Sequence, residues 1–209
     1  MRALSMVFLA IALTAASFLV SCSQTSNPTA DQTVKAGSPV ASGPVTAKTA
    51  YVAMYQSAYK WTPDVVLLRL EPKDTDGMQR ESGKAMVWEG TFASPRQHSY
   101  RVFSYAVAAQ PPDLYQGVNI GRAIPWAGAT RDVMPVDSSM FKVDSDAAYN
   151  TAANDAAAWL KKNPDKKLTT FQLGNGYSFP APVWYAVWGT KKSGYAAFVC
   201  AATGKVLKK

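Results

Sequence analysis

The 209-residue chain is 48% hydrophobic and 17% charged, with a formal net charge of +8. This composition is typical of a folded globular protein and excludes a disordered or collagen-like chain. Its two cysteines exclude a scaffold held by several disulfides, and its single histidine excludes any site that needs two imidazoles.

The first residues have the pattern of an export signal. Arg2 precedes an apolar run from Ala3 to Val20, and the run ends in Ser21 and Cys22. A basic start, an apolar middle and a small residue before the cleavage point are typical of a secretory signal. A transmembrane anchor is the alternative, but it needs about 20 apolar residues, and this run is slightly shorter. We therefore expect residues 1–21 to be a signal peptide.

The end of this run, Leu19-Val20-Ser21-Cys22, resembles the lipobox of bacterial lipoproteins. The resemblance implies cleavage before Cys22, a diacylglyceryl group on its sulfur, and a further acyl chain such as palmitate on the new amino terminus. Two or three acyl chains anchor a protein firmly, whereas one binds only marginally. Ser23 replaces the Asp that retains such proteins in the inner membrane, which implies the outer membrane, facing the periplasm, in a Gram-negative cell. Lipidation of Cys22 would leave Cys200 without a partner for an internal disulfide.

A linker is expected between the lipid and the folded part. Residues 22–47 are rich in Ser, Thr, Pro, Gly and Ala and contain no aromatic residue, a composition typical of a flexible tether. All the Trp and Tyr residues lie within residues 48–209. We therefore expect the hydrophobic core in that part of the chain.

The core region contains two similar runs of predicted elements. Each run has a helix followed by three strands, and a turn at Pro-Asp follows each helix. The first run has a helix at 49–61 and strands at 65–70, 85–93 and 100–108; the second has a helix at 146–162 and strands at 167–173, 182–189 and 194–201. A segment broken by prolines separates them, with one further strand at 117–123, and a short apolar pair, 206–207, ends the chain.

Residue matches between the two runs predict an internal duplication. The matched positions are Pro63-Asp64 with Pro164-Asp165, Val87-Trp88 with Val183-Trp184, and Tyr100 and Phe103 with Tyr195 and Phe198. The alternative is two unrelated helix-plus-hairpin stretches. We expect an α+β fold of two similar units, each with a helix packed on an antiparallel sheet: a first unit with its connecting segment at 48–141 and a second at 142–209.

The second unit resembles the PepSY domain family. The resemblance is carried by the strand Pro182–Trp188 and by the ending Val199-Cys200-Ala201-Ala202-Thr203-Gly204-Lys205-Val206-Leu207, in which Cys200 replaces the family's Asp. It covers about residues 142–209, with an echo over 48–108. The resemblance implies a non-catalytic α+β module of secreted and cell-surface proteins that regulates or inhibits peptidases through protein contacts.

The catalytic motifs are fragmentary. Ser139, Lys142 and Lys192-Ser193-Gly194 have the spacing of two boxes of penicillin-binding enzymes, but no Ser-x-Asn box lies between them. Asp74-Thr75-Asp76-Gly77 begins like a calcium loop and lacks the later ligands, so a turn is the better interpretation. His98 is expected in a solvated hairpin turn. We therefore expect no enzyme, no cofactor and no metal site.

Charge and aromatic residues give the remaining site predictions. Residues 142–209 contain ten lysines and four aspartates. The candidate binding surface is Trp184, Tyr185, Trp188, Lys191 and Lys192, with core packing of the tryptophans and a merely solvated lysine face as the alternatives.

The function expected from these features is that of a non-catalytic, membrane-anchored lipoprotein of the bacterial cell envelope. It would bind a protein or peptide partner, with regulation of an envelope peptidase as the specific expectation. The alternative is a structural or ligand-holding lipoprotein that binds anionic lipid or glycan through its lysine-rich C-terminal half. Nucleic acid is not an expected partner of an exported chain.

Overall fold

The computed structural model describes residues 42–176, 178–190 and 192–208. The predicted signal peptide (1–21), the lipidation site Cys22, most of the predicted linker and Lys191 lie outside the described residues.

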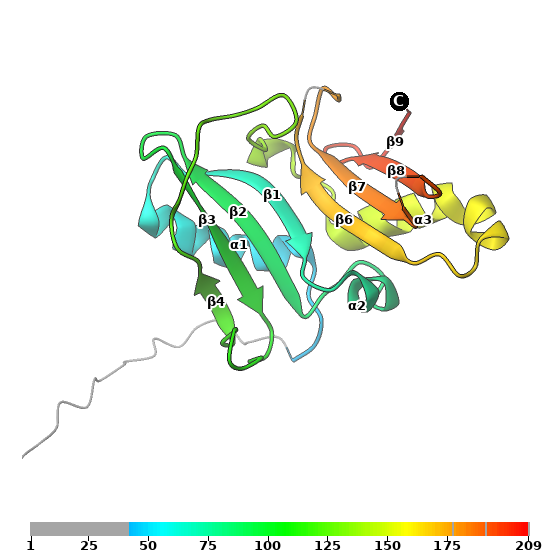
Figure 1. The fold of residues 1–209 in the computed structure, drawn as a ribbon, viewed down its shortest axis with the longest axis horizontal. Helices are drawn as coiled ribbons and strands as arrows, with labels where there is room; N and C mark the ends of the chain where they lie inside the picture. The colour runs from blue at the N-terminus through cyan, green and yellow to red at the C-terminus, as the bar shows by residue number, and fades with distance from the viewer. Residues whose placement is uncertain (1–41, 177, 191, 209) are drawn as a thin grey trace, which may run out of the picture. The chain divides into compact units, whose positions relative to one another are not determined.

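The described chain alternates helices with antiparallel strands (Figure 1). The helices are α1 (Ala47–Trp61), α2 (Thr75–Arg80), the 3₁₀ helix η1 (Ser138–Met140) and α3 (Ser145–Lys162). The strands are β1 (Val66–Pro72), β2 (Val87–Ser94), β3 (Ser99–Ala106), β4 (Gly117–Ile120), β5 (Ile124–Pro125), β6 (Leu168–Gly174), β7 (Val183–Trp188), β8 (Tyr195–Cys200) and β9 (Val206–Leu207). The predicted α+β class is confirmed.

All of these strands belong to one antiparallel sheet. Its order is β4-β3-β2-β1-β6-β7-β8-β9, with β5 paired to β3 beside β4. The two halves of the chain meet where β1 pairs with β6, with Leu70 opposite Leu173 and Arg69 opposite Gly174. A separation into two units with a sheet each is therefore not confirmed, because both halves contribute strands to one sheet.

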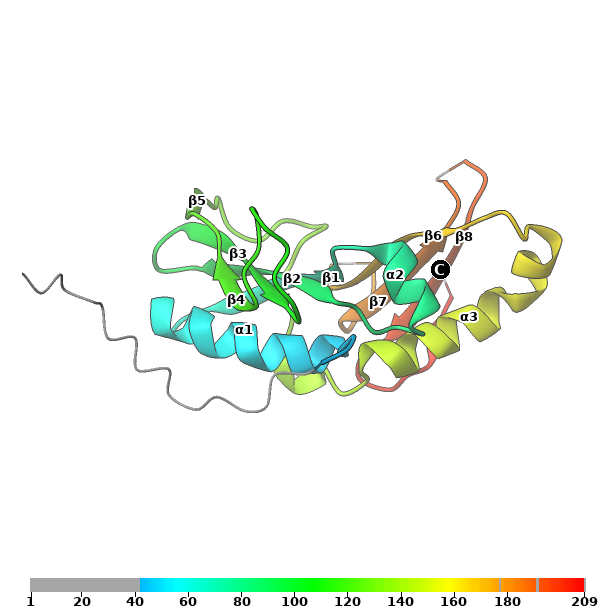
Figure 2. The ribbon, with the colours of Figure 1, turned by 90° about the horizontal axis from the view of Figure 1, so that it is seen from below.

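The long helices α1 and α3 lie along the same face of this sheet (Figure 2). Each helix packs through fully buried residues spaced four apart, which are small except for Met54: Ala50, Met54 and Ala58 in α1, and Ala148, Ala152 and Ala156 in α3. Residues four apart share one helix face. Small side chains there let the helix axis approach the sheet closely, and large side chains of the strands fill the space between.

The N-termini of α1 and α3 meet and share their caps. The Asp144 carboxylate is the N-cap of α3, where it accepts the backbone N–H of Ser145 at 2.7 Å, and it also accepts the N–H of Lys48 in α1 at 2.9 Å. The buried Ser145 hydroxyl accepts the N–H of Ala47 at 2.9 Å. Thr46, at the N-cap of α1, makes no capping bond with its own side chain. One helix therefore supplies the groups that satisfy the first N–H groups of the other.

The same tryptophan contact occurs in each half of the sheet. The Trp88 indole in β2 donates to the carbonyl of Val45, which precedes α1, at 2.9 Å. The Trp184 indole in β7 donates to the carbonyl of Val143, which precedes α3, at 3.0 Å. The two rings meet edge to face, with centroids 6.5 Å apart. Each indole thus ties the start of a helix to the strand beneath it.

The structure corrects one pairing between the halves. Trp88 lies opposite Tyr105 on the neighbouring strand, whereas Trp184 lies opposite Val199. If the tryptophans are equivalent, Phe198 therefore corresponds to the residue after Phe103 and not to Phe103 itself. Phe103 lies in the core under the helices, whereas Phe198 lies on the other face of the sheet. A shift of one residue moves a side chain to the opposite face of a strand, so the expected match was wrong.

Two local expectations also change. Val45 pairs with Ala85 and α1 begins at Ala47, so the linker predicted to reach residue 47 ends before Val45. The turn expected at Asp74–Gly77 is the start of α2. This helix is stabilised by tertiary contacts that local preferences do not reveal: Met78 is fully buried, and the Gln79 side chain accepts the N–H of the first residue of β6.

Candidate binding groove

The structure places two residues of the predicted binding surface in the core. Trp184 and Trp188 are 0% and 1% exposed, on the face of β7 that α3 covers. The Trp184 ring stacks on Phe171 at 4.9 Å and meets Phe141 edge to face at 5.8 Å. An exposed surface made of these two tryptophans is therefore excluded, because other side chains occupy the space over both rings.

Tyr185 lies on the opposite face of β7 and is half-buried. Its ring meets Phe198 edge to face at 5.6 Å and Phe179 at 6.3 Å. These contacts fix the plane of the ring, and burial raises the pKa of its hydroxyl above the ordinary value. Among the predicted surface residues, Tyr185 is the one that lines a cavity.

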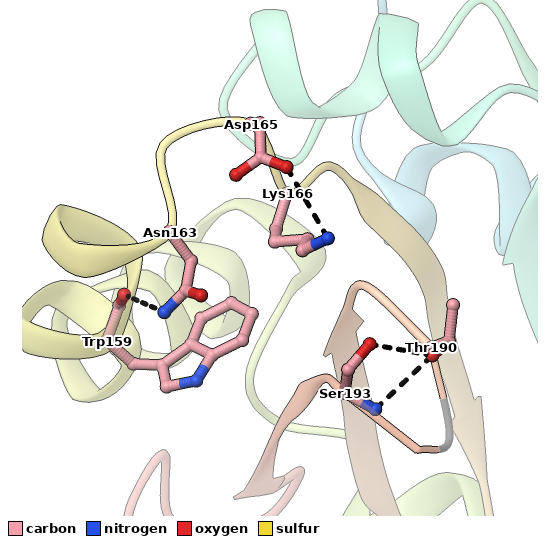
Figure 3. A network of polar contacts seen from close by, with 6 residues as sticks. All are labelled: Trp159, Asn163, Asp165, Lys166, Thr190 and Ser193. Atoms are coloured by element: carbon pink, nitrogen blue, oxygen red, sulfur yellow. Dashed lines mark hydrogen bonds and ion pairs between the residues drawn. The ribbon is translucent and has the colours of Figure 1, made fainter.

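Lys192 is exposed in the hairpin between β7 and β8. Figure 3 shows this end of the molecule, where the Thr190 and Ser193 side chains bond to each other at 3.1 Å across the hairpin. Nearby, Lys166 pairs with Asp165 at 3.4 Å. Described lysines of this region are thus solvated or paired with aspartates, and none of them lines the cavity that Tyr185 faces.

That cavity is a groove of about 680 Å³ on the face of the sheet opposite α1 and α3. This volume is in the range of ordinary ligand sites. Side chains of the five central strands form its floor, and the chain segments at 124–133 and 174–176, together with Ser178, form its walls. We call this cavity the groove below.

The floor takes one side chain from each of five neighbouring strands. In spatial order these are Val102 (β3), Thr91 (β2), Arg69 (β1), Gln172 (β6) and Tyr185 (β7). Thr91 lies directly opposite both Val102 and Arg69, and Gln172 lies directly opposite Tyr185. The row therefore crosses the strands, with a shift of two residues at the junction, because Arg69 lies opposite Gly174 and not opposite Gln172. At about 4.8 Å per strand it extends about 19 Å.

Short backbone bonds hold the first wall against the sheet. β5 pairs with β3 through Ile124 opposite Tyr100, and the N–H of Trp126 donates to the carbonyl of His98 at 2.8 Å. This places Trp126 beside Tyr100 at one end of the groove. His98 itself lies in the exposed turn between β2 and β3.

The second wall is tied to the first. The N–H of Met134 donates to the carbonyl of Asn175 at 3.0 Å, and the Asn175 side chain donates to the carbonyl of Pro135 at 2.9 Å. A Cβ on Gly176 would lie 3.2 Å from the carbonyl oxygen of Asp132. The absence of a side chain at Gly176 therefore lets the two walls pack closely.

Charges of the groove are largely balanced. The Arg69 guanidinium pairs with Glu71 at 3.2 Å, and Glu71 lies opposite Glu89, which pairs with Lys73 at 3.9 Å. Burial raises the pKa of the Glu71 carboxyl, and the Arg69 charge opposes this rise while Glu89 adds to it. On the wall, Arg131 and Asp132 are neighbours of opposite sign.

The catalytic fragments do not assemble among the described residues. Ser139 lies in η1, where its backbone N–H donates to the Asp137 carboxylate at 2.9 Å, and no hydrogen bond joins its side chain to Lys142 or Ser193. In the same part of the chain, no three His, Cys, Asp or Glu side chains gather as metal ligands. No helix there is both long and apolar enough to cross a membrane.

Sequence reasoning missed most of the groove. Tyr100 was noted only as a strand residue, and Trp126 was assigned to the poorly patterned connecting segment. The signal that was available is the alternation in β6 and β7, where Gln172 and Tyr185 interrupt apolar neighbours and so mark the face away from the helices. The walls come from segments about 50 residues apart, and no local pattern brings these segments together.

Comparisons with known proteins give no family. No protein-family model matches the chain, and no curated relative matches it. Among solved structures, the chain is similar to a candidate lipoprotein from Clostridium difficile 630, with 11% identity over 76% of this chain and 90% of that chain and a TM-score of 0.48. A likeness at this level carries no argument about function. The resemblance to the PepSY family stays a prediction.

Proposed function

We propose that this protein is a membrane-anchored lipoprotein of the bacterial envelope that binds an extended ligand in the groove and catalyses no reaction. The observation that carries the binding proposal is the groove itself. It is about 680 Å³ in volume and is lined by three aromatic side chains, Tyr100, Trp126 and Tyr185, together with polar groups. Concave sites of this size with aromatic walls and a few convergent polar groups are typical of ligand binding.

The anchor rests on the lipobox pattern that ends in Cys22. Acyl chains at this residue, followed by the predicted linker, would confine the groove to the membrane surface and raise its local concentration there. Replacement Cys22→Ala is expected to abolish incorporation of labelled palmitate and to leave an unprocessed precursor. Persistent labelling of the variant would contradict the lipobox assignment.

The partner that the sequence predicts first is a protein or peptide, and more specifically an envelope peptidase. The alternative, binding of anionic lipid or glycan by the lysine-rich half, would use a different surface, because no lysine of the described residues lines the groove. Salt distinguishes binding in the groove from binding by the lysines. Attraction between exposed charges is screened over about 8 Å at physiological ionic strength and over about 3 Å at 1 M, so binding by the lysines should weaken as salt is added.

The groove can be tested with a variant that fills it. Gly174 lies on the groove, and a Cβ there would meet only the Tyr185 ring, at 3.8 Å, so a side chain can be added without backbone strain. After cross-linking in cells and purification of the lipidated protein, we expect the wild type and the exposed-site control Ala157→Leu to retain their bound ligand and Gly174→Leu to lose it. Equal retention by Gly174→Leu, at unchanged melting temperature, would overturn the groove as the binding site.

A further inference from the structure

We propose that the ligand of the groove is a linear, neutral saccharide chain laid across the strands of the sheet. This inference rests on the proposed function and names the chemical class of the ligand. A saccharide ring has C–H-bearing faces, which pack on flat aromatic rings, and a rim of hydroxyl groups, which need hydrogen-bond partners. The groove offers both kinds of group, with aromatic rings at its ends and hydrogen-bonding side chains between them.

Aromatic platforms stand at the two ends of the row. Tyr185 is fixed at one end by Phe179 and Phe198. Gly174 lies beside this ring and carries no side chain that would cover it. Tyr100 and Trp126 stand at the other end, held together by the pairing of β5 with β3. Rings whose orientation is already set lose little entropy when a ligand stacks on them.

Hydrogen-bonding side chains occupy the middle of the row. Gln172, Arg69 and Thr91 lie between the two aromatic ends, on β6, β1 and β2. Within the described residues the Gln172 amide has no hydrogen-bond partner, although it is half-buried. The amide presents two donors and an acceptor beside the Tyr185 ring, directly opposite it in the sheet. The polar atoms of this amide are open to solvent, and a hydroxyl rim turned toward the floor would take the place of solvent there.

Balanced charge favours a neutral ligand. Arg69 is paired with Glu71, Arg131 adjoins Asp132 on the wall, and none of the lysines in the described part of the chain lines the groove. An acidic polymer would therefore gain little binding free energy from charge attraction in the groove.

A peptide fits the floor less well than a saccharide does. Of the floor strands, β2 and β7 are paired on both sides along most of their length, so they leave little backbone for an added strand; β1 and β6 pair with each other through two residues each. An extended peptide would bring one N–H and one C=O per residue to a floor with few side chains to satisfy them.

The test is calorimetric titration of the purified full-length protein, in a detergent without a sugar headgroup, with two probes. The probes are chitohexaose and cellohexaose, β1,4-linked chains with and without acetamido groups. We expect at least one to bind, with an affinity unchanged between about 0.05 and 0.5 M salt because the saccharide carries no charge. Trp126→Ala and Gln172→Leu are each expected to weaken binding about tenfold or more, equivalent to about 1.4 kcal/mol. Tyr59→Ala is the control, since Tyr59 is an exposed aromatic residue of α1 that does not line the groove.

The outcomes separate this inference from the proposed function. Absence of binding by both hexasaccharides at millimolar concentration, or binding that survives both groove substitutions, overturns the saccharide inference. A peptide library displayed against the same protein provides the second arm. Selected peptides that require Trp126 would leave the groove as the binding site and identify a peptide as its ligand. If neither hexasaccharide binds and no selected peptide requires Trp126, the proposal that the groove is the binding site is contradicted as well.

Discussion

At the scale of single residues, Asp144 has the largest structural role outside the core. Its carboxylate accepts N–H groups from the first turns of both α3 and α1. An ordinary N-cap contributes about 0.5–2 kcal/mol, and the negative charge also suits the positive ends of both helix dipoles. The two halves of the chain are therefore linked by this side chain as well as by the sheet.

Replacement Asp144→Ala is expected to lower the free energy of unfolding by about 2 kcal/mol, the upper end of the range for an N-cap, because two helices lose a cap. The measurement is urea denaturation followed by circular dichroism. Asp146→Ala is the matched control, since its carboxylate accepts only the N–H of the next residue of α3. Equal losses in the two variants would show that the contact with α1 contributes nothing.

Asp64 holds the turn between β2 and β3. Its carboxylate accepts hydrogen bonds from the Thr62 hydroxyl, from the backbone N–H of Arg96 at 2.8 Å and from the Ser94 hydroxyl at 2.9 Å. These bonds favour the ionised form and lower the pKa of Asp64 to about 2, with the Thr62 bond as the largest cause. The equivalent residue after α3, Asp165, is exposed and pairs only with Lys166 (Figure 3).

The pH dependence of this contact has a defined sign. A lowered pKa means that the ionised carboxylate stabilises the fold above its ordinary pKa of 3.8 and that this contribution disappears as the pH falls through about 2. The stability difference between wild type and Asp64→Asn should thus be constant from pH 7 to about pH 5 and shrink toward pH 2. A stability difference between wild type and Asp64→Asn that is the same at pH 6 and pH 2.5 would contradict the role given to the Asp64 carboxylate in this turn.

At the scale of elements, the small-residue faces of the helices determine how closely they pack. Ala152 is fully buried against the sheet, whereas Ala157, on the same helix, is exposed. Ala152→Leu should destabilise the fold by about 1–3 kcal/mol because added methyl groups overpack the interface. Ala157→Leu should change the stability by no more than about 0.5 kcal/mol. Thermal unfolding of the two variants checks this, and similar melting temperatures would contradict the packing described.

Local sequence patterns predicted most of the elements for identifiable reasons. The β-branched and aromatic run Val183–Trp188 is a buried central strand, and the cap and alanine-rich interior of α3 predicted its bounds within one residue. The exception is α2, whose Asp and Gly favour a turn. Its helical form depends on the burial of Met78 and on the bond from Gln79 to β6, which are contacts between distant parts of the chain.

At the scale of the whole molecule, the unpredicted feature is the pairing of β1 with β6. It joins residues about 100 apart and makes one sheet from both halves, which no local periodicity reveals. The same pairing creates the groove, since its floor crosses from β3 to β7 over this junction. The sequence therefore predicted aromatic residues at a binding face but named two, Trp184 and Trp188, that the helices cover.

The covered and open faces of the sheet thus have different roles in this account. Helices α1 and α3 stabilise one face, and the other face is left for the ligand, with walls from the segments at 124–133 and 174–176 and from Ser178. The claim that decides the proposed function is that the ligand contacts the open face.

The most direct test is site-specific photo-cross-linking in cells that produce the lipidated protein. A photoreactive phenylalanine derivative would replace Tyr100, in the groove, or Tyr59, which is 54% exposed on α1. The account predicts a discrete adduct from position 100 that Gly174→Leu removes, and none from position 59. An adduct from position 59 with none from position 100 would place the binding surface on the helical side and contradict the account.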